Sequence, residues 1–228
     1  MDILFLLQAN TDTLATETAQ SGISLFQLLM KGGFFMIPIL ILSILALFIF
    51  FERLFTINQA IKEPEALMGT VSKHILNGNV NGAIAACQEK ETPIGRIIEK
   101  GLRRLGKPMK SIEKAMEGVA KLELLQLEKR LPLLATIAGA APMVGFLGTV
   151  TGMIKAFYDL ANNADGGVID SGLLANGIYE ALITTAAGLT VGIIAYIGYN
   201  FLAARINKVI FQIENASNQL SDLLQEPV

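Results

Sequence analysis

Three long runs of apolar residues divide the chain, and charged residues stand at their borders. The runs cover 34–51, 131–154 and 181–204, and none of them contains Asp, Glu, Lys, Arg or His. Each has the length of roughly 17–25 residues with which a helix crosses a bilayer. The pattern therefore predicts three transmembrane helices and an all-α integral membrane protein.

Between the first and second runs, the periodicity of apolar residues predicts short helices separated by turn residues. We expect helices over about 65–76, 80–88 and 93–105, with stop signals at 77–79 and 106–108. This part of the chain is therefore expected to fold as a helical domain next to the membrane.

The second and third apolar runs are expected to belong to longer helices. Apolar residues spaced by three or four lead from Ser111 into the second run, and only Pro132 interrupts them, which predicts one helix of about 45–50 residues. The third run continues with the same spacing to Leu220 as an amphipathic tail. Before the first run, 21–33 has the pattern of a short amphipathic helix on the outer surface.

Basic residues set the expected orientation. The stretch from Arg53 to Arg130 holds 14 Lys and Arg, Lys31 alone precedes the first run, and 156–180 holds none. The rule that basic residues remain in the cytoplasm applies weakly to the middle of a loop this long, but the clusters Glu52-Arg53 and Lys129-Arg130 beside the apolar runs agree with it. The N-terminus is therefore expected outside and the C-terminus inside. The expected layout is an outer N-terminal segment with an amphipathic helix (1–33), transmembrane helices (34–51, 131–155 and 180–204), a cytoplasmic helical domain (52–130), an outer loop (156–179) and a cytoplasmic C-terminal helix (205–228).

Composition narrows the classes of function. The chain is 52% hydrophobic and only 17% charged, as expected of a membrane protein. Its basic residues are mixed with acidic ones, which argues against nucleic-acid binding. A single cysteine, Cys87, and a single histidine, His74, argue against a disulfide framework and a metal centre. With no P-loop and no nucleophile elbow, we expect neither an enzyme nor a cofactor.

The second run carries a face of small residues. Gly145, Gly148 and Gly152 recur at helical spacing, and the hydroxyls of Thr149 and Thr151 lie beside them. Such a face lets helix backbones approach closely, while hydroxyls in lipid either bond to the carbonyl one turn back or serve a polar path. Both interpretations, helix packing and the lining of a polar path, remain open for this segment.

The third run repeats the theme. Thr184, Gly188 and Gly192 lie one turn apart, and Thr185 stands beside them. We expect the glycines of both runs to serve helix packing, while hydroxyls on both helices leave a polar lining open; Thr151 and Thr184 have no assigned role. Thr190 is a further hydroxyl without an assigned role.

Two charged residues border these runs on the outer side. Glu180 opens the third run, and it is either an interfacial carboxylate at a helix N-terminus or a deeper, functional one. Lys155 closes the second run and has Asp159 one turn on as a partner, or Glu180 across the loop.

The apolar runs hold no group that titrates. A proton carrier needs such a group within the membrane, so this chain would relay protons only with a carboxylate from another protein. The sequence therefore predicts an obligate hetero-complex.

The paired motifs resemble a known family. The second run contains Ala141-Pro142…Gly145-Phe-Leu-Gly148-Thr149-Val150-x-Gly152, and the third follows Gly177-Ile-x-Glu180-Ala181-Leu-x-x-Thr185-Ala186-x-Gly188-Leu189. With three spans and a large cytoplasmic loop, this is similar to the ExbB/TolQ branch of the MotA/TolQ/ExbB proton-channel family. Flagellar stators have four spans and fit less well.

The resemblance implies a subunit of a proton-driven motor in the bacterial inner membrane, with its N-terminus in the periplasm. It implies a homopentamer around single-span ExbD-like or TolR-like partners that supply a membrane Asp, and a TonB-like or TolA-like protein that is driven. Thr149 and Thr185 are implied to line the pore, and Glu180 matches the acidic position at the start of the third span. A TolQ-like subunit of the Tol-Pal system and a non-conducting scaffold are the alternatives.

Overall fold

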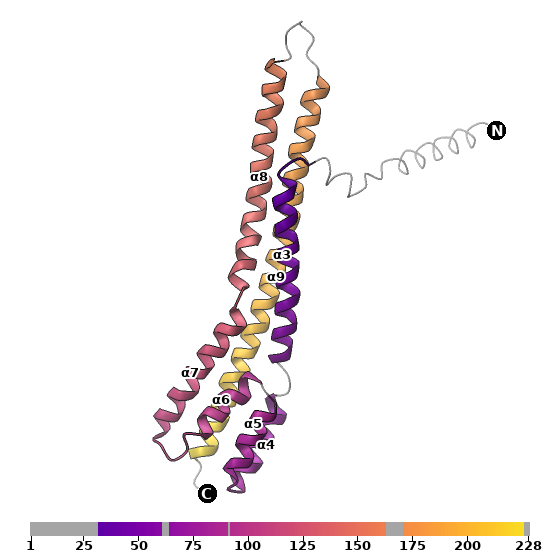
Figure 1. Cartoon of the computed structure of the whole chain (residues 1–228). Coiled ribbons are helices and arrows are strands. Elements are labelled where there is room, and N and C mark those ends of the chain that lie inside the picture. Colours follow the sequence, from indigo (N-terminus) through magenta and orange to yellow (C-terminus); the bar gives the residue numbers. More distant parts are fainter. Residues whose placement is uncertain (1–31, 61–63, 91, 163–170, 226–228) are drawn as a thin grey trace, which may run out of the picture. The chain divides into compact units, whose positions relative to one another are not determined.

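The computed structural model describes residues 32–60, 64–90, 92–162 and 171–225, and the regular structure among them is helical throughout. Three helical stretches are long and apolar enough to cross a membrane, one from Met36 and two within Met109–Asn162 and Leu174–Gln225. The predicted all-α class with three spans is confirmed. The helices are α3 (Met36–Ala60), α4 (Pro64–Leu76), α5 (Val80–Glu89), α6 (Pro93–Leu102), α7 (Met109–Glu128), α8 (Leu131–Asn162) and α9 (Ser171–Gln225), as drawn in Figure 1. The amphipathic helix expected over 21–33 lies almost entirely outside the described residues.

The chain divides into two compact units. Unit 1 comprises 1–40 and 142–189, and unit 2 comprises 41–141 and 190–228. Unit 1 therefore holds both threonine-bearing segments, and unit 2 holds the short helices and the C-terminal half of α9.

The short helices α4, α5 and α6 of unit 2 begin within one residue of the positions that the sequence predicts. The side chain of Asn79 accepts a hydrogen bond from the Gly82 amide at 2.9 Å and caps α5. Thr92 caps α6 in the same way through Gly95 at 3.1 Å. Such caps satisfy amides that have no partner within the helix. α6 ends at Leu102, three residues before the expected end, because the following residues form tight turns that close with Gly106 at a φ of 86°.

The long helix expected from Ser111 through the second run is interrupted. Pro132 has no N–H to donate to the carbonyl of Glu128, and its ring would collide with that carbonyl in a continuous helix. α7 accordingly ends at Glu128, Arg130 adopts a φ of 70°, and α8 begins at Leu131. The prediction of a single helix was therefore wrong here. The predicted continuation of the third run is confirmed, because α9 is unbroken for 55 residues.

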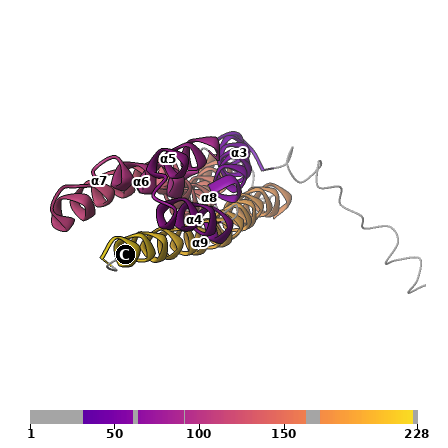
Figure 2. The same cartoon turned by 90° about the horizontal axis from the view of Figure 1, so that it is seen from below.

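Unit 2 is held together by a core of branched aliphatic side chains. α4, α5 and α6 lie along the C-terminal half of α9 (Figures 1 and 2). Val71, Ile98, Val209 and Leu220 in this core are fully buried. Cys87 is buried in the same cluster, as a small hydrophobic residue.

Candidate functional site in the paired helices of unit 1

Within unit 1, α8 and α9 approach each other through small residues. A Cβ atom added to Gly145 would lie 2.8 Å from the carbonyl oxygen of Thr184 and 3.2 Å from the Cα of Gly188. One added to Gly152 would lie 3.1 Å from the Cβ of Ala181. Contacts this short leave no room for a side chain, so the two backbones themselves are in contact.

The contact continues along both helices. A Cβ on Gly148 would meet the Thr184 hydroxyl at 2.7 Å, and one on Gly177 would meet the Cβ of Ala156 at 2.5 Å. Four of the five expected packing glycines thus lie in this contact. The fifth, Gly192, is buried in unit 2.

Three hydroxyls meet at the centre of the contact. The hydroxyls of Thr149 and Thr185 hydrogen-bond to each other. Thr149 also reaches the carbonyl oxygen of Ala181 at 3.1 Å, and Thr185 reaches that of Gly145 at 3.1 Å. Thr184 donates to the Ala181 carbonyl at 2.7 Å and lies 3.4 Å from that of Gly145. We call these three hydroxyls and two carbonyls the threonine cluster.

The threonine cluster can place all three of its hydroxyl protons. Thr184 donates to Ala181, and Thr185 donates to Gly145. Thr149 then donates to the Thr185 oxygen and keeps its own lone pairs for another donor. Because either hydroxyl of the pair can be the donor, the direction of the hydrogen bond between them can reverse. The cluster is therefore neutral and satisfied. It can accept one further hydrogen bond at Thr149, and it can donate one only if a hydroxyl proton turns away from its acceptor within the cluster.

Thr184 was missed as a member of this group. Sequence reasoning placed it on a packing stripe with Gly188, but its side chain is only 2% exposed and bonds to both carbonyls of the cluster. Thr151, in contrast, bonds only within its own helix, to Leu147 at 2.9 Å and Gly148 at 3.2 Å. Thr190 lies in unit 2.

Glu180 stands one turn before Thr184 and is half-buried. Its carboxylate occupies the space where a side chain on Gly33 would be, and Gly33 has a φ of 63° just before α3. Glycine is the residue that adopts this left-handed conformation without strain. The turn into the first span and the acidic residue that opens the third are therefore in contact.

Lys155 does not take up either expected pairing. Its side chain is exposed on α8, and within the described chain it forms no ion pair with Asp159 or Glu180. Its neighbour Ala156 faces Gly177 across the helix contact instead. Lys155 therefore lies beside the contact and outside the threonine cluster.

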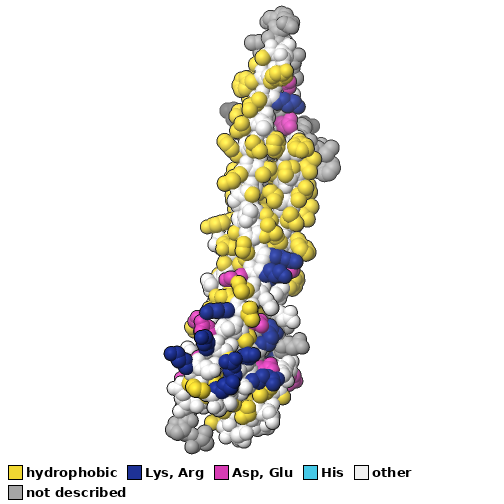
Figure 3. Space-filling model, turned by 60° about the vertical axis from the view of Figure 1, so that its left-hand side comes forward, with side chains coloured by type: hydrophobic (Ala, Val, Ile, Leu, Met, Phe, Trp, Pro, Cys, Tyr) yellow, Lys and Arg dark blue, Asp and Glu magenta, His cyan; other side chains and the backbone are white. Residues whose placement is uncertain are grey.

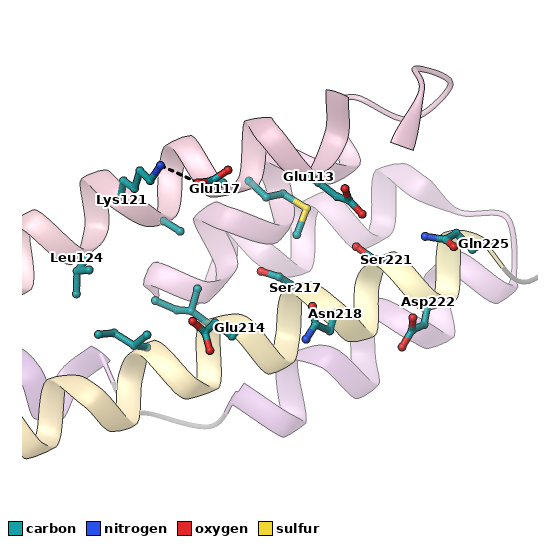
Figure 4. Close-up of a pocket in the computed structure, with 14 residues that line it drawn as sticks. Glu113, Glu117, Lys121, Leu124, Glu214, Ser217, Asn218, Ser221, Asp222 and Gln225 are labelled. Carbon is teal, nitrogen blue, oxygen red and sulfur yellow. Dashed lines mark ion pairs between the residues drawn. The ribbon is translucent and has the colours of Figure 1, made fainter. Parts of the chain in front are cut away.

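Unit 2 contains a separate groove between α7 and α9, with a volume of about 700 Å³ (Figure 4). Glu113, Glu117, Glu214 and Asp222 line it, and Lys121 pairs with Glu117 at 2.7 Å. Over the described residues, no group of three or more His, Cys, Asp or Glu is arranged to hold a metal ion. The groove therefore offers acidic surface and carries no metal centre of that kind.

The region of this chain that is similar to known proteins includes the threonine cluster. A family model described as the MotA/TolQ/ExbB proton channel family matches residues 89–215 and so includes the threonine cluster and Glu180. The chain is 33% identical over 200 residues to the putative biopolymer transport protein ExbB-like 1 of Synechocystis, covering 88% of this chain and 77% of that protein. It is 35% identical over 116 residues to the Tol-Pal system protein TolQ of Haemophilus influenzae, covering 51% and 50%. Biopolymer transport protein ExbB of Aquifex aeolicus is 36% identical over 96 residues, covering 42% and 63%.

Proposed function

The chain belongs to the MotA/TolQ/ExbB proton channel family, and on that premise we propose that it is an ExbB-like subunit of an inner-membrane proton-driven motor. In this proposal five copies form a pore around ExbD-like single-span partners. The complex uses the proton-motive force to energise TonB-dependent import across the outer membrane. The observation that carries the proposal is the threonine cluster, which joins two apolar runs (131–154 and 181–204) that hold no charged residue.

The proposed role of the cluster follows from what hydroxyls can do beside a carboxyl group. A protonated Asp of the partner donates a hydrogen bond to an oxygen lone pair of Thr149. The deprotonated Asp instead accepts a hydrogen bond from the Thr149 hydroxyl. Thr149 and Thr185 can therefore stabilise both states of the partner's carboxyl group without titrating. The partner carries the proton, and this chain supplies the polar lining.

Glu180 is proposed to tune the outer half of the path. A carboxylate at the entrance attracts protons and favours a positive charge near it. Its contact with Gly33 ties this position to the turn before the first span, so movement of that span would shift the carboxylate.

The test is the double variant Thr149→Ala and Thr185→Ala, expressed with the partner and checked for assembly. We expect an intact complex that has lost energised function. Thr151→Ala is the matched control, because that hydroxyl bonds only to its own helix, and it should retain function. Full activity in the double variant would refute the lining role.

A TolQ-like role is the second candidate, since relatives named TolQ match about half of the chain. The two roles differ in the protein that is driven. Identification of the neighbouring reading frames separates them: a TonB-like frame supports the import motor, and a Tol-Pal frame supports envelope maintenance.

A non-conducting scaffold is the third candidate, because the glycine contact alone would hold helices together. Co-purification with a single-span protein that bears a membrane Asp, and loss of function when that Asp becomes Asn, would argue against it.

A further inference from the structure

Unit 2 contains a second pocket, of about 480 Å³, between α3, α6 and α7. Three basic side chains line it, with a single acidic one among them, and half of its other lining residues are polar. The lining residues that the argument uses are Arg53, Arg96, Glu123, Gln126 and Lys129. We call it the basic pocket.

The basic pocket lies at the level of the inner headgroups. Arg53 follows the first apolar run by two positions, and Lys129 precedes the second run by two. On the face shown in Figure 3, Lys and Arg side chains of unit 2 gather directly beyond its hydrophobic, membrane-spanning part. Phosphate groups of the cytoplasmic leaflet occupy the same level.

The pocket and its border carry an excess of positive charge. Arg96 holds Glu123 through two bonds of 2.6 Å, and Glu52 is shared between Arg53 and Arg130. Lys129 is exposed and has no acidic partner within the described chain. Lys129 thus adds a positive charge beside these two ion-paired groups, and this charge favours an anion at the pocket.

Arg53 is the most constrained of these groups, with 6% of its surface exposed. One terminal nitrogen donates to the carbonyl of Gln126 at 3.0 Å, and the other to Glu52 at 2.9 Å. Its Nε is buried without an acceptor in the described structure. A buried donor without an acceptor costs free energy, so an oxygen supplied by a ligand at this pocket would stabilise the site.

We propose that the basic pocket binds the phosphate of an anionic phospholipid from the cytoplasmic leaflet. A phosphate diester offers several acceptor oxygens, which suits guanidinium and ammonium donors. The membrane supplies this group at high local concentration where the pocket opens. A lipid held there would fix α3 against α6 and α7 at the membrane boundary.

Native mass spectrometry of the delipidated full chain tests the proposal. The protein is titrated with dioleoyl-phosphatidylglycerol, dioleoyl-phosphatidylcholine or sodium phosphate. We expect tighter binding of phosphatidylglycerol than of phosphatidylcholine. Lys129→Gln should weaken the phosphatidylglycerol affinity about fivefold, which corresponds to about 1 kcal/mol for one basic group at an anionic surface.

Two variants make the result specific. Lys129→Arg keeps the charge and should bind like the original chain. Lys110→Gln removes an exposed lysine that does not line the pocket and should also leave binding unchanged. Equal affinity for the two lipids, or unchanged binding in Lys129→Gln, would overturn the proposal. Displacement of the lipid by an equal concentration of sodium phosphate would overturn the assignment to a lipid.

Discussion

The two units hold their helices together by opposite means. In unit 1, α8 and α9 meet through glycines and alanines, and the bonds between them join hydroxyls to carbonyls. In unit 2, the C-terminal half of α9 buries large aliphatic side chains such as Val209 and Leu220. Lipid is as apolar as leucine and gives no hydrophobic drive to pair helices, so close packing and polar contacts must serve instead. Wherever water is the alternative environment, burial of apolar side chains such as these is itself stabilising.

This contrast has a functional side. A contact made of backbones and hydroxyls leaves polar groups inside the membrane, where they can serve a proton path. A contact made of aliphatic side chains offers none. Unit 1 is thus held by close backbone packing with few large apolar contacts, whereas the aliphatic core of unit 2 supplies stability by burial. The two units should consequently respond in opposite ways when side chains are enlarged or truncated.

The largest effect is expected from truncation in the core of unit 2. Leu220→Ala removes a fully buried side chain and should cost about 2–5 kcal/mol, from lost burial and the cavity left behind. Denaturant unfolding followed by circular dichroism measures it. Leu76→Ala, at a position 63% exposed, is the control and should change the free energy of unfolding by about 0.5 kcal/mol or less.

In unit 1, a larger side chain at a glycine of the helix contact should lower the stability of the protein. Gly145→Ala places a Cβ 2.8 Å from the Thr184 carbonyl oxygen, so α8 and α9 must separate, at about 1–3 kcal/mol. The thermal midpoint of the purified protein should fall. Gly139→Ala is matched in chemistry but meets nothing within 4 Å, and should not destabilise the protein. Equal behaviour of the two variants would remove the basis for a backbone contact in unit 1.

Ion pairs in unit 2 should matter according to their burial. Arg96→Ala leaves the carboxylate of Glu123, which is 9% exposed, without its partner, and should cost about 1–3 kcal/mol. Lys121→Ala breaks an exposed pair with Glu117 and should cost about 0.5 kcal/mol or less. Both costs are measured as changes in the free energy of unfolding. A greater loss in Lys121→Ala would contradict this ranking.

The smallest effect is expected when the folded protein is treated with a reagent that modifies the thiol of Cys87. Burial raises the pKa of its thiol to about 11, and the nearby charge of Glu99 adds to the rise. Little thiolate is therefore present at pH 8, and the sulfur is covered. A maleimide should leave the folded protein unlabelled and react once the protein is unfolded. Rapid labelling of the folded protein would mean that the core of unit 2 opens readily.

Much of the fold could be predicted from the sequence because its signals are local. The length of the apolar runs predicted the three spans, and the turn residues at 77–79 and 106–108 predicted where the short helices are separated. The caps formed by Asn79 and Thr92 were not predicted. The break at Arg130 was missed because a proline acts on the carbonyl four residues before it, ahead of its own position.

The threonine cluster was predicted only in part. The spacing of Gly145, Gly148 and Gly152 predicted a packing face, and the family resemblance singled out Thr149 and Thr185, but neither indicated which atoms meet. The role of Thr184 depends on carbonyls of two helices, and no pattern within one helix reveals such a partner. The exposed, unpaired position of Lys155 likewise depends on how α8 is turned toward α9.

Proton flux through the reconstituted complex tests the central claim most directly. The protein and its single-span partner are placed in liposomes, and proton uptake is followed with a pH-sensitive dye under an imposed potential. Thr149→Val with Thr185→Val keeps the shape of both side chains and removes the hydroxyls, whereas the paired Ser substitutions keep the hydroxyls. The account predicts at least about a tenfold loss of flux for the Val pair, the effect of roughly 1.4 kcal/mol, and near-normal flux for the Ser pair. Normal flux through the Val pair in an assembled complex would contradict it.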